Sequence, residues 1–375
     1  MAITDSGSVL ILGAGASAPF GLPLGGSLID LVRDLLLAEL EHRAAKPNRQ
    51  RDAVYITSRP KKNGKSQFIT ASILQSRNVS SALWEFEVNT PMRRLARLLD
   101  NQTSQTIDDF IAINPDTARL TKIGVAAVLF HHLYQKRNAT WKLKPLSTRY
   151  LKKSPNEKNS DRRNWVHHLI NLVRHENFEK STGEQAKVRI ISFNYDGILE
   201  HILDRQFNNT GHEFGPWRDY IEIVHPHGFM GELDEEIENP EKVIEVWAES
   251  INVVKESNPS EEVTTARATA KKWILSASDI YMVGFALSGP NAEMLGLGQQ
   301  KTNSQNWHIA NYDGSPGLRR TIEGYVKASV DEQTIDYREE YRIYGITHFP
   351  EVGTKDDPLH IDTWFEIGAA GQMPA

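Results

Sequence analysis

The chain has 375 residues, of which 39% are hydrophobic and 24% are charged, the composition of an ordinary globular protein. It contains no cysteine, which excludes disulfides, cysteine-ligated zinc modules and cysteine nucleophiles, and which fits a reducing compartment. The net charge is −5, but residues 1–190 carry 29 basic and 17 acidic residues, whereas residues 191–375 carry 14 and 31. This asymmetry favours self-assembly through opposite charges or a charged partner, and simple solvation of both surfaces is the alternative.

The first residues lack the basic and apolar regions that define a signal peptide. No apolar stretch of the sequence is long enough to span a bilayer. We therefore expect a cytoplasmic protein with no membrane contact.

The first distinctive stretch is residues 8–23, which read SVLILGAGASAPFGLP. The branched apolar run Val9–Leu12 is typical of a buried strand, and the letters GAGAS follow it directly. Two glycines allow the backbone to turn tightly and to approach a ligand without a side chain in between. A helix that begins near Ser17 would direct its free N–H groups at the turn, so the stretch predicts a bound phosphate.

A helix-rich segment separates this stretch from the next strand. Helical spacing of apolar residues predicts helices at 27–41, 91–99, 106–113, 121–134 and 164–177. Residues 44–82 are rich in lysine and arginine, which favours a solvated loop or a contact with nucleic acid or another partner. A second polar, basic loop is expected over 142–163. We therefore expect a basic loop and a large helical insertion over residues 44–186.

Strands and helices alternate over the rest of the chain. Short runs of branched apolar residues predict four more strands, with helices between them, and the strands lie at 188–193, 221–224, 280–283 and 307–310. This alternation predicts an α/β fold, a Rossmann-like parallel sheet with helices on both faces. The expected domains are residues 1–43 with 187–330 as the sheet domain, 44–186 as the insertion and 331–375 as a C-terminal extension.

Polar residues and glycines follow the predicted strands, where the ligands of such sheets bind. They are Asn194 and Asp196 after the second strand, His227 after the third, Gly284 and Ser288 after the fourth, and Asn311 after the fifth. The common dehydrogenase arrangement needs an acidic residue about 20 positions beyond the glycine turn. Asp34 is the residue near that distance, and it lies inside a predicted helix. We therefore exclude that arrangement and expect Asn311 to contact a ribose.

Asn194 and His227 are the candidate catalytic residues. The Asn194 amide can orient a ribose hydroxyl or a water, and a histidine has an unperturbed pKa that suits acid–base work near neutral pH. The alternatives are structural, because Asp196 can cap the following helix and His227 can be a hydrogen-bonded turn residue. His225 and His227 have no evident third ligand, so no metal is expected.

These motifs, taken together, resemble those of the sirtuin family. GAGAS followed by FGLP looks like the opening GAG-[I/A]-S and G-[I/L]-P motif of that family, and FNYD resembles its [Q/F/Y]-N-x-D motif. HPHG resembles the strand-end HG of sirtuins, and GFALS resembles their G-[T/F]-S-[L] loop. The resemblance covers most of the chain apart from the helical insertion and the C-terminal extension.

The resemblance implies that residues 1–43 and 187–330 form an NAD-binding domain, with NAD as the substrate. Asn194 would then position the nicotinamide ribose and the attacking water, and His227 would be the general base. The implied cofactor-binding residues are Gly13, Ala14, Gly15 and Ser17 at the phosphates, Pro23, Gly284 and Ser288 nearby, Asp196 at the nicotinamide end or the local turn, and Asn311 toward the adenosine.

Two departures from the deacylases of this family bear on the activity. Those enzymes carry a four-cysteine zinc ribbon and continue the proline motif with D-F-R, whereas this chain has no cysteine and reads LGG after Pro23. The insertion, with its TIDDF motif, is similar to sirtuin-like NAD hydrolases of bacterial antiphage systems, most of all to the stand-alone subunit that assembles with a HerA-type ATPase. The resemblance thus implies hydrolysis of NAD to nicotinamide and ADP-ribose, in a homo-oligomer that has such an ATPase as partner.

Two other classes of function stay open. A non-catalytic sensor would bind NAD or ADP-ribose and regulate a partner without turnover. A protein deacylase or ADP-ribosyltransferase would release nicotinamide only with an added protein substrate, and the absence of cysteine weighs against the deacylase.

Overall fold

The fold is given by a computed structural model. The structure describes residues 7–45, 90–104, 106–137, 140–144, 146, 165–179, 187–208, 215–254, 259–285, 287–297, 306–310 and 324. The chain forms two compact units. The first comprises Met1–Gly21, Leu146–Gly228 and Ser257–Ala375, and the second comprises Leu22–Pro145 and Phe229–Glu256.

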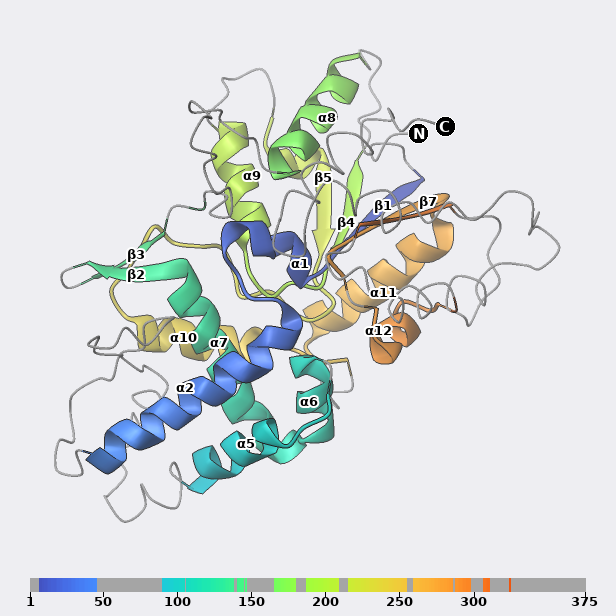
Figure 1. Ribbon diagram of the computed structural model, residues 1–375. Coiled ribbons are helices and arrows are strands. Elements are labelled where there is room, and N and C mark those ends of the chain that lie inside the picture. Colours follow the sequence, from blue (N-terminus) through green and yellow to red (C-terminus); the bar gives the residue numbers. More distant parts are fainter. Residues whose placement is uncertain are drawn as a thin grey trace, which may run out of the picture. The chain divides into compact units, whose positions relative to one another are not determined.

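The first unit is built on a five-stranded sheet in the order β5-β4-β1-β7-β8, and every neighbouring pair in it is parallel (Figure 1). Its strands are β1 (Ser8–Leu12), β4 (Val188–Ser192), β5 (Ile221–Val224), β7 (Asp279–Val283) and β8 (Asn306–Ala310). The five predicted strands and their parallel arrangement are therefore confirmed. Apolar runs made these strands recognisable, because a parallel sheet buries its strands on both faces.

Helices cover both faces of this sheet. In Figure 1, α8 (Trp165–Glu179) and α9 (Ile198–Asn208) lie on one side of the strands, and α11 (Glu261–Ser276) and α12 (Gly289–Met294) lie on the other. Val9 and Ile11 of β1 pack into one core cluster with Trp273 of α11. Successive side chains of a strand point to opposite faces, and Leu10 is also fully buried, so the second face is covered as well.

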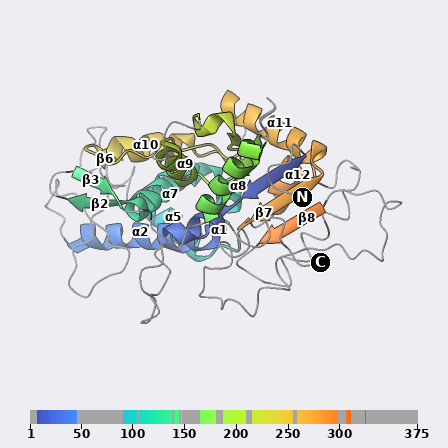
Figure 2. The same ribbon diagram turned by 90° about the horizontal axis from the view of Figure 1, so that it is seen from above.

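The second unit combines helices with a small antiparallel sheet. Its helices are α2 (Gly25–Ala45), α5 (Thr90–Asp100), α6 (Ile107–Ile113), α7 (Ala118–Leu133) and α10 (Pro240–Ser250). The strands β2 (Tyr134–Arg137), β3 (Thr140–Leu143) and β6 (Glu236–Ile237) pair in that order (Figure 2). Helix α2 packs against α5 and α7, and α7 packs against α10. Among the described residues, no helix is both long and apolar enough to cross a membrane.

The helix predictions are confirmed in kind, with shifted ends. The TIDDF helix begins at its expected cap, because the Thr106 hydroxyl accepts from the N–H of Asp109 at 3.2 Å. The prediction for 121–134 is wrong at its end, since the helix stops at Leu133 and Tyr134 opens β2. The loop predicted over 142–163 is wrong at its start, which lies inside β3. Short strands with exposed polar side chains, such as the YQKR of β2, lack the apolar pattern that would reveal them.

The compact units are divided at different places from the predicted domains. Helix α8 lies in the range 44–186 that was expected to be the insertion, yet it belongs to the unit of the large sheet. Its first residue, Trp165, donates from Nε1 to the main-chain oxygen of Ala16 at 2.9 Å. Helix α2 belongs to the other unit, although the predicted helix 27–41 was placed wholly in the sheet domain. Residues 46–89, Asn311 and 331–375, which also carried predictions, lie outside the described residues.

Candidate functional site

The glycine turn after β1 packs against the loop after β7. The N–H of Gly13 donates to the oxygen of Val283 at 3.0 Å, and the N–H of Gly15 donates to the oxygen of Gly284 at 2.9 Å. A Cβ on Gly15 would lie 2.6 Å from Cα of Gly284, and a Cβ on Gly13 would lie 2.5 Å from Cα of Phe285. The absence of side chains at these glycines therefore serves the close approach of two strand-end loops.

The helix expected near Ser17 begins earlier and is short. Helix α1 spans Ala14–Ser17, and the 3₁₀ helix η1 (Ala18–Phe20) continues it directly. The phosphate prediction depends on glycines that a ligand can approach and on a helix that begins near Ser17. In the structure the missing Cβ atoms of Gly13 and Gly15 face the loop after β7, and the α-helical segment has four residues and ends at Ser17. A phosphate at this turn stays a prediction.

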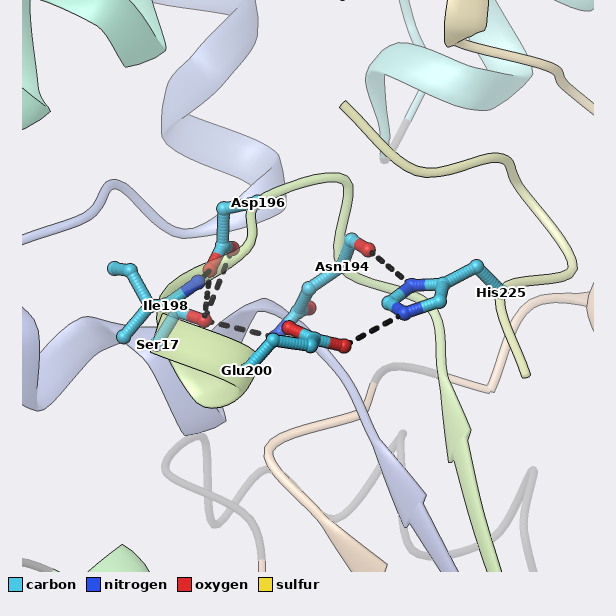
Figure 3. A network of polar contacts seen from close by, with 6 residues as sticks. All are labelled: Ser17, Asn194, Asp196, Ile198, Glu200 and His225. Atoms are coloured by element: carbon cyan, nitrogen blue, oxygen red, sulfur yellow. Dashed lines mark hydrogen bonds and ion pairs between the residues drawn. The ribbon is translucent and has the colours of Figure 1, made fainter. Parts of the chain in front are cut away.

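Three buried polar side chains meet where β1 and β4 end (Figure 3). Ser17 Oγ lies 3.0 Å from Oδ2 of Asp196 and 3.3 Å from its Oδ1. Nδ2 of Asn194 donates to Ser17 Oγ at 2.9 Å. The structure thus brings together three of the predicted site residues, from segments 177 and 179 residues apart in the chain. Asp196 also accepts the N–H of Ile198 at 3.1 Å, so it caps α9 as the structural alternative expected.

The direction of these hydrogen bonds fixes the orientation of the Asn194 amide. Ser17 has one hydroxyl proton, and an ionised Asp196 can only accept it. Ser17 Oγ must therefore accept from Asn194, which assigns Nδ2 to the serine and turns Oδ1 the other way. Asn194 Oδ1 is buried and has no hydrogen-bond partner among the described residues. The arrangement presents an acceptor that would bind the proton of a water or of a sugar hydroxyl.

The pKa of the Asp196 carboxyl lies well above its ordinary value. Burial raises its pKa to about 6, although the hydrogen bonds from the Ile198 N–H and the Ser17 hydroxyl favour the charged form. The negative charge of Glu200 raises the pKa of Asp196 further, and His225 opposes that effect. The carboxyl that orients Asn194 therefore titrates close to neutral pH, which is typical of functional sites.

A second ionisable pair reaches Asn194 from the opposite side. Nε2 of His225 lies 2.8 Å from Oε1 of Glu200, and Nδ1 of the same ring lies 3.3 Å from the main-chain oxygen of Asn194 (Figure 3). Glu200 is on α9 and His225 follows β5 directly. Both side chains are largely buried.

His227 lies beside the same strand end. Its ring is 1% exposed and sits edge-on to Phe193, with 5.0 Å between ring centroids, and it stacks on Tyr195 at 6.1 Å. Its Nε2 lies 3.0 Å from Oδ1 of Asn291 in α12. An amide oxygen only accepts, so Nε2 carries the proton, and the lone pair of the neutral ring is on Nδ1. His227 is thus a turn residue with a fixed tautomer next to both neighbours of Asn194.

The other predicted residues are placed as follows. Ala14 opens α1 and is half-buried, Ser288 precedes α12 and is half-buried, and Gly284 has a φ of 59° in the loop after β7. Pro23 belongs to the second unit, and Asn311 lies outside the described residues. Gly284 is the position where glycine is required twice, by its positive φ and by the backbone of Gly15 at 2.5 Å from a Cβ.

Sequence reasoning missed the roles of three residues. Glu200 lies in the first turn of α9, four positions after Asp196, and this short separation could have placed the two acids near each other. His225 was weighed as a metal ligand, whereas the structure pairs it with Glu200. Asn291 carried no local signal, because its contact with His227 joins segments 64 residues apart. Across the described part of the chain, no group of three His, Asp or Glu side chains could hold a metal.

No known protein-family model matches this chain, and no curated protein matches it either.

Proposed function

We propose that this chain is an NAD⁺ hydrolase that cleaves the nicotinamide–ribose bond and yields nicotinamide and ADP-ribose. The observation that carries the proposal is the buried Oδ1 of Asn194 at the carboxyl edge of a parallel sheet, which has no hydrogen-bond partner in the part of the chain that the structure describes. Ser17 and Asp196 set its orientation. A fixed acceptor at that edge is suited to hold the water or the ribose hydroxyl of a nucleotide substrate.

The order of the strands supports a dinucleotide as the ligand. Numbered along the chain within the large sheet, the order β5-β4-β1-β7-β8 is 3-2-1-4-5. This is the order of the Rossmann fold, in which the ligand lies where the strand order reverses. The reversal falls at β1, so the glycine turn, the Asn194 network and the loop after β7 surround the expected site.

The chemistry needs a water, an acceptor and a base. The bond between the anomeric carbon and the pyridinium nitrogen breaks, and its electron pair goes to nicotinamide, which leaves as a neutral molecule. The ribose passes through an oxocarbenium-like state and forms a new bond to the water oxygen. Asn194 Oδ1 would orient that water, and Nδ1 of His227, which has the lone pair, would take its proton.

The resemblance to sirtuin-like NAD hydrolases supplies the remaining contacts. The pyrophosphate is proposed to lie near residues 13–17 and near Gly284 and Ser288, with Asn311 toward the adenosine. No metal is proposed. The same resemblance leads us to propose that the protein acts in the cytoplasm, as a homo-oligomer with a HerA-type ATPase, and depletes NAD⁺ during phage infection.

The test is NAD⁺ turnover by the full chain with and without a HerA-type ATPase, followed by chromatography. We expect nicotinamide and ADP-ribose in equal amounts, with no protein substrate added. NAD⁺ or ADP-ribose binding without turnover in the assembled complex would replace the proposal by a sensor. Nicotinamide release that depends on an added protein would replace it by a deacylase or an ADP-ribosyltransferase.

A further inference from the structure

Asn194 is held at two points, and only one of them involves its side chain. The amide donates to Ser17, while the main-chain oxygen lies 3.3 Å from Nδ1 of His225. The other nitrogen of that ring is 2.8 Å from Glu200. Figure 3 shows Asn194 between the two arms, with Ser17 and Asp196 on one side and His225 on the other.

We propose that Glu200 and His225 are positioning residues for Asn194. The pair keeps a proton on Nδ1 of His225, and that proton fixes the peptide group from which the Asn194 side chain extends. The effect on hydrolysis rests on the proposed function, whereas the proton arrangement is a property of the folded chain itself.

The proton arrangement follows from what each atom can do. A main-chain oxygen only accepts, so the contact with Asn194 requires a proton on Nδ1 of His225. The contact with Glu200 shares one further proton, whether it resides on Nε2 or on the carboxyl oxygen. Both assignments leave Nδ1 protonated. Without a partner at Nε2, a neutral imidazole is free to adopt the other tautomer, which would release the Asn194 oxygen.

The burial of Glu200 favours its pairing with His225. Glu200 is 4% exposed, and its Oε2 has no hydrogen-bond partner among the described residues. An isolated buried carboxylate is costly, whereas the pair with His225 is neutral overall in either proton assignment. Asp196 precedes α9, four positions before Glu200, and it accepts hydrogen bonds from the Ser17 hydroxyl and the Ile198 N–H. Each acid therefore holds a different part of Asn194, one the side chain and the other the main chain.

Two substitutions at one position separate positioning from simple packing. Glu200→Leu removes the partner of His225, and we expect kcat for nicotinamide release to fall roughly 10- to 100-fold, because small misplacement of a reacting group has effects of this size. KM for NAD⁺ should stay within about twofold, since Glu200 is not among the residues proposed to contact NAD⁺. Glu200→Gln can donate to Nε2 and preserves the proton on Nδ1, so it should restore most of kcat.

The matched control is Gln206→Leu on the same helix. Gln206 Nε2 lies 2.8 Å from Nδ1 of His167, so this substitution also removes a polar contact between α9 and a histidine. It should lower the melting temperature without lowering kcat. If Glu200→Leu folds with the wild-type melting temperature and retains wild-type kcat, the positioning role is wrong.

A measurement without substrate completes the test. In the ¹⁵N-histidine-labelled wild-type chain, the His225 signals, assigned by their loss in His225→Gln, should show a protonated Nδ1. Glu200→Leu should shift them toward a mixture of tautomers, and Glu200→Gln should not. A bare Nδ1 in the wild type would overturn the inference. If the wild-type complex releases no nicotinamide, the proposed function is wrong. The tautomer of His225 then still tests whether Glu200 and His225 hold the Asn194 main chain.

Discussion

At the scale of single residues, the direction of three hydrogen bonds decides what Asn194 offers to a ligand. An ionised Asp196 takes the Ser17 proton, Ser17 takes an amide proton, and Oδ1 of Asn194 is left as an acceptor. A protonated Asp196 could instead donate to Ser17, whose proton would then be available to the amide oxygen. The charge on Asp196 thus sets whether the site presents an acceptor or a donor.

The substitution Asp196→Asn tests the role of the Asp196 charge, first through stability and then through activity. Burial raises the Asp196 pKa from 3.8 to about 6, so the folded chain binds this proton more tightly than the unfolded chain. Below pH 4 the raised pKa contributes about 3 kcal/mol to the free energy of unfolding. This contribution is lost as pH rises through about 6. The melting temperature of Asp196→Asn relative to wild type should therefore increase across this range in thermal scans.

The same substitution should abolish nicotinamide release at pH 8. The new amide can donate to Ser17 and reverse the hydrogen-bond chain, as a protonated Asp196 would. For the same reason, wild-type turnover should fall as pH drops below about 6. A stable Asp196→Asn protein with wild-type turnover at pH 8 would contradict the role of this carboxylate.

At the scale of elements, the close contact between the loops after β1 and β7 explains why both loops carry glycine. Gly15 and Gly284 approach so closely that a Cβ on either one would lie within 2.6 Å of the other's backbone. The backbone atoms there cannot give way cheaply, because both loops are tied to neighbouring parallel strands. The glycine-rich turn therefore has a structural function in addition to the proposed phosphate contact.

Gly284→Ala should destabilise the fold by more than about 2 kcal/mol, since it adds both a steric clash and a strained positive φ. Thermal scans or urea titrations followed by tryptophan fluorescence would measure the change. Gly25→Ala is the matched control, because a Cβ there has no heavy atom within 4 Å. Equal stability of Gly284→Ala and wild type would show that the two loops do not pack in this way.

The sequence was sufficient for the strands of the large sheet and for the meeting of Ser17, Asn194 and Asp196, whose role as site residues stays a prediction. Buried parallel strands are continuous apolar runs, and polar residues at their carboxyl ends converge by topology. The sequence was insufficient for His225 with Glu200, because that contact depends on the register between β5 and α9. It was insufficient for β2 and β3 as well, since strands of four residues carry little periodicity.

At the scale of the whole molecule, two units share one chain, and the chain passes between them more than once. Every described residue of the Asn194 network belongs to the unit of the large sheet. The helical unit, with its TIDDF cap, contributes none of those contacts. The proposed chemistry therefore belongs to the unit of the large sheet.

The catalytic role of Asn194 is tested by nicotinamide release from Asn194→Ala and wild type in the assembled complex. Asn252→Ala is the matched control, because both asparagines are 8% exposed and Asn252 donates to a main-chain oxygen in the second unit. Nicotinamide release should fall at least about 100-fold in Asn194→Ala and in His227→Ala, and should persist in the control. Wild-type rates of NAD⁺ cleavage in a folded Asn194→Ala complex would show that Asn194 has no part in the reaction.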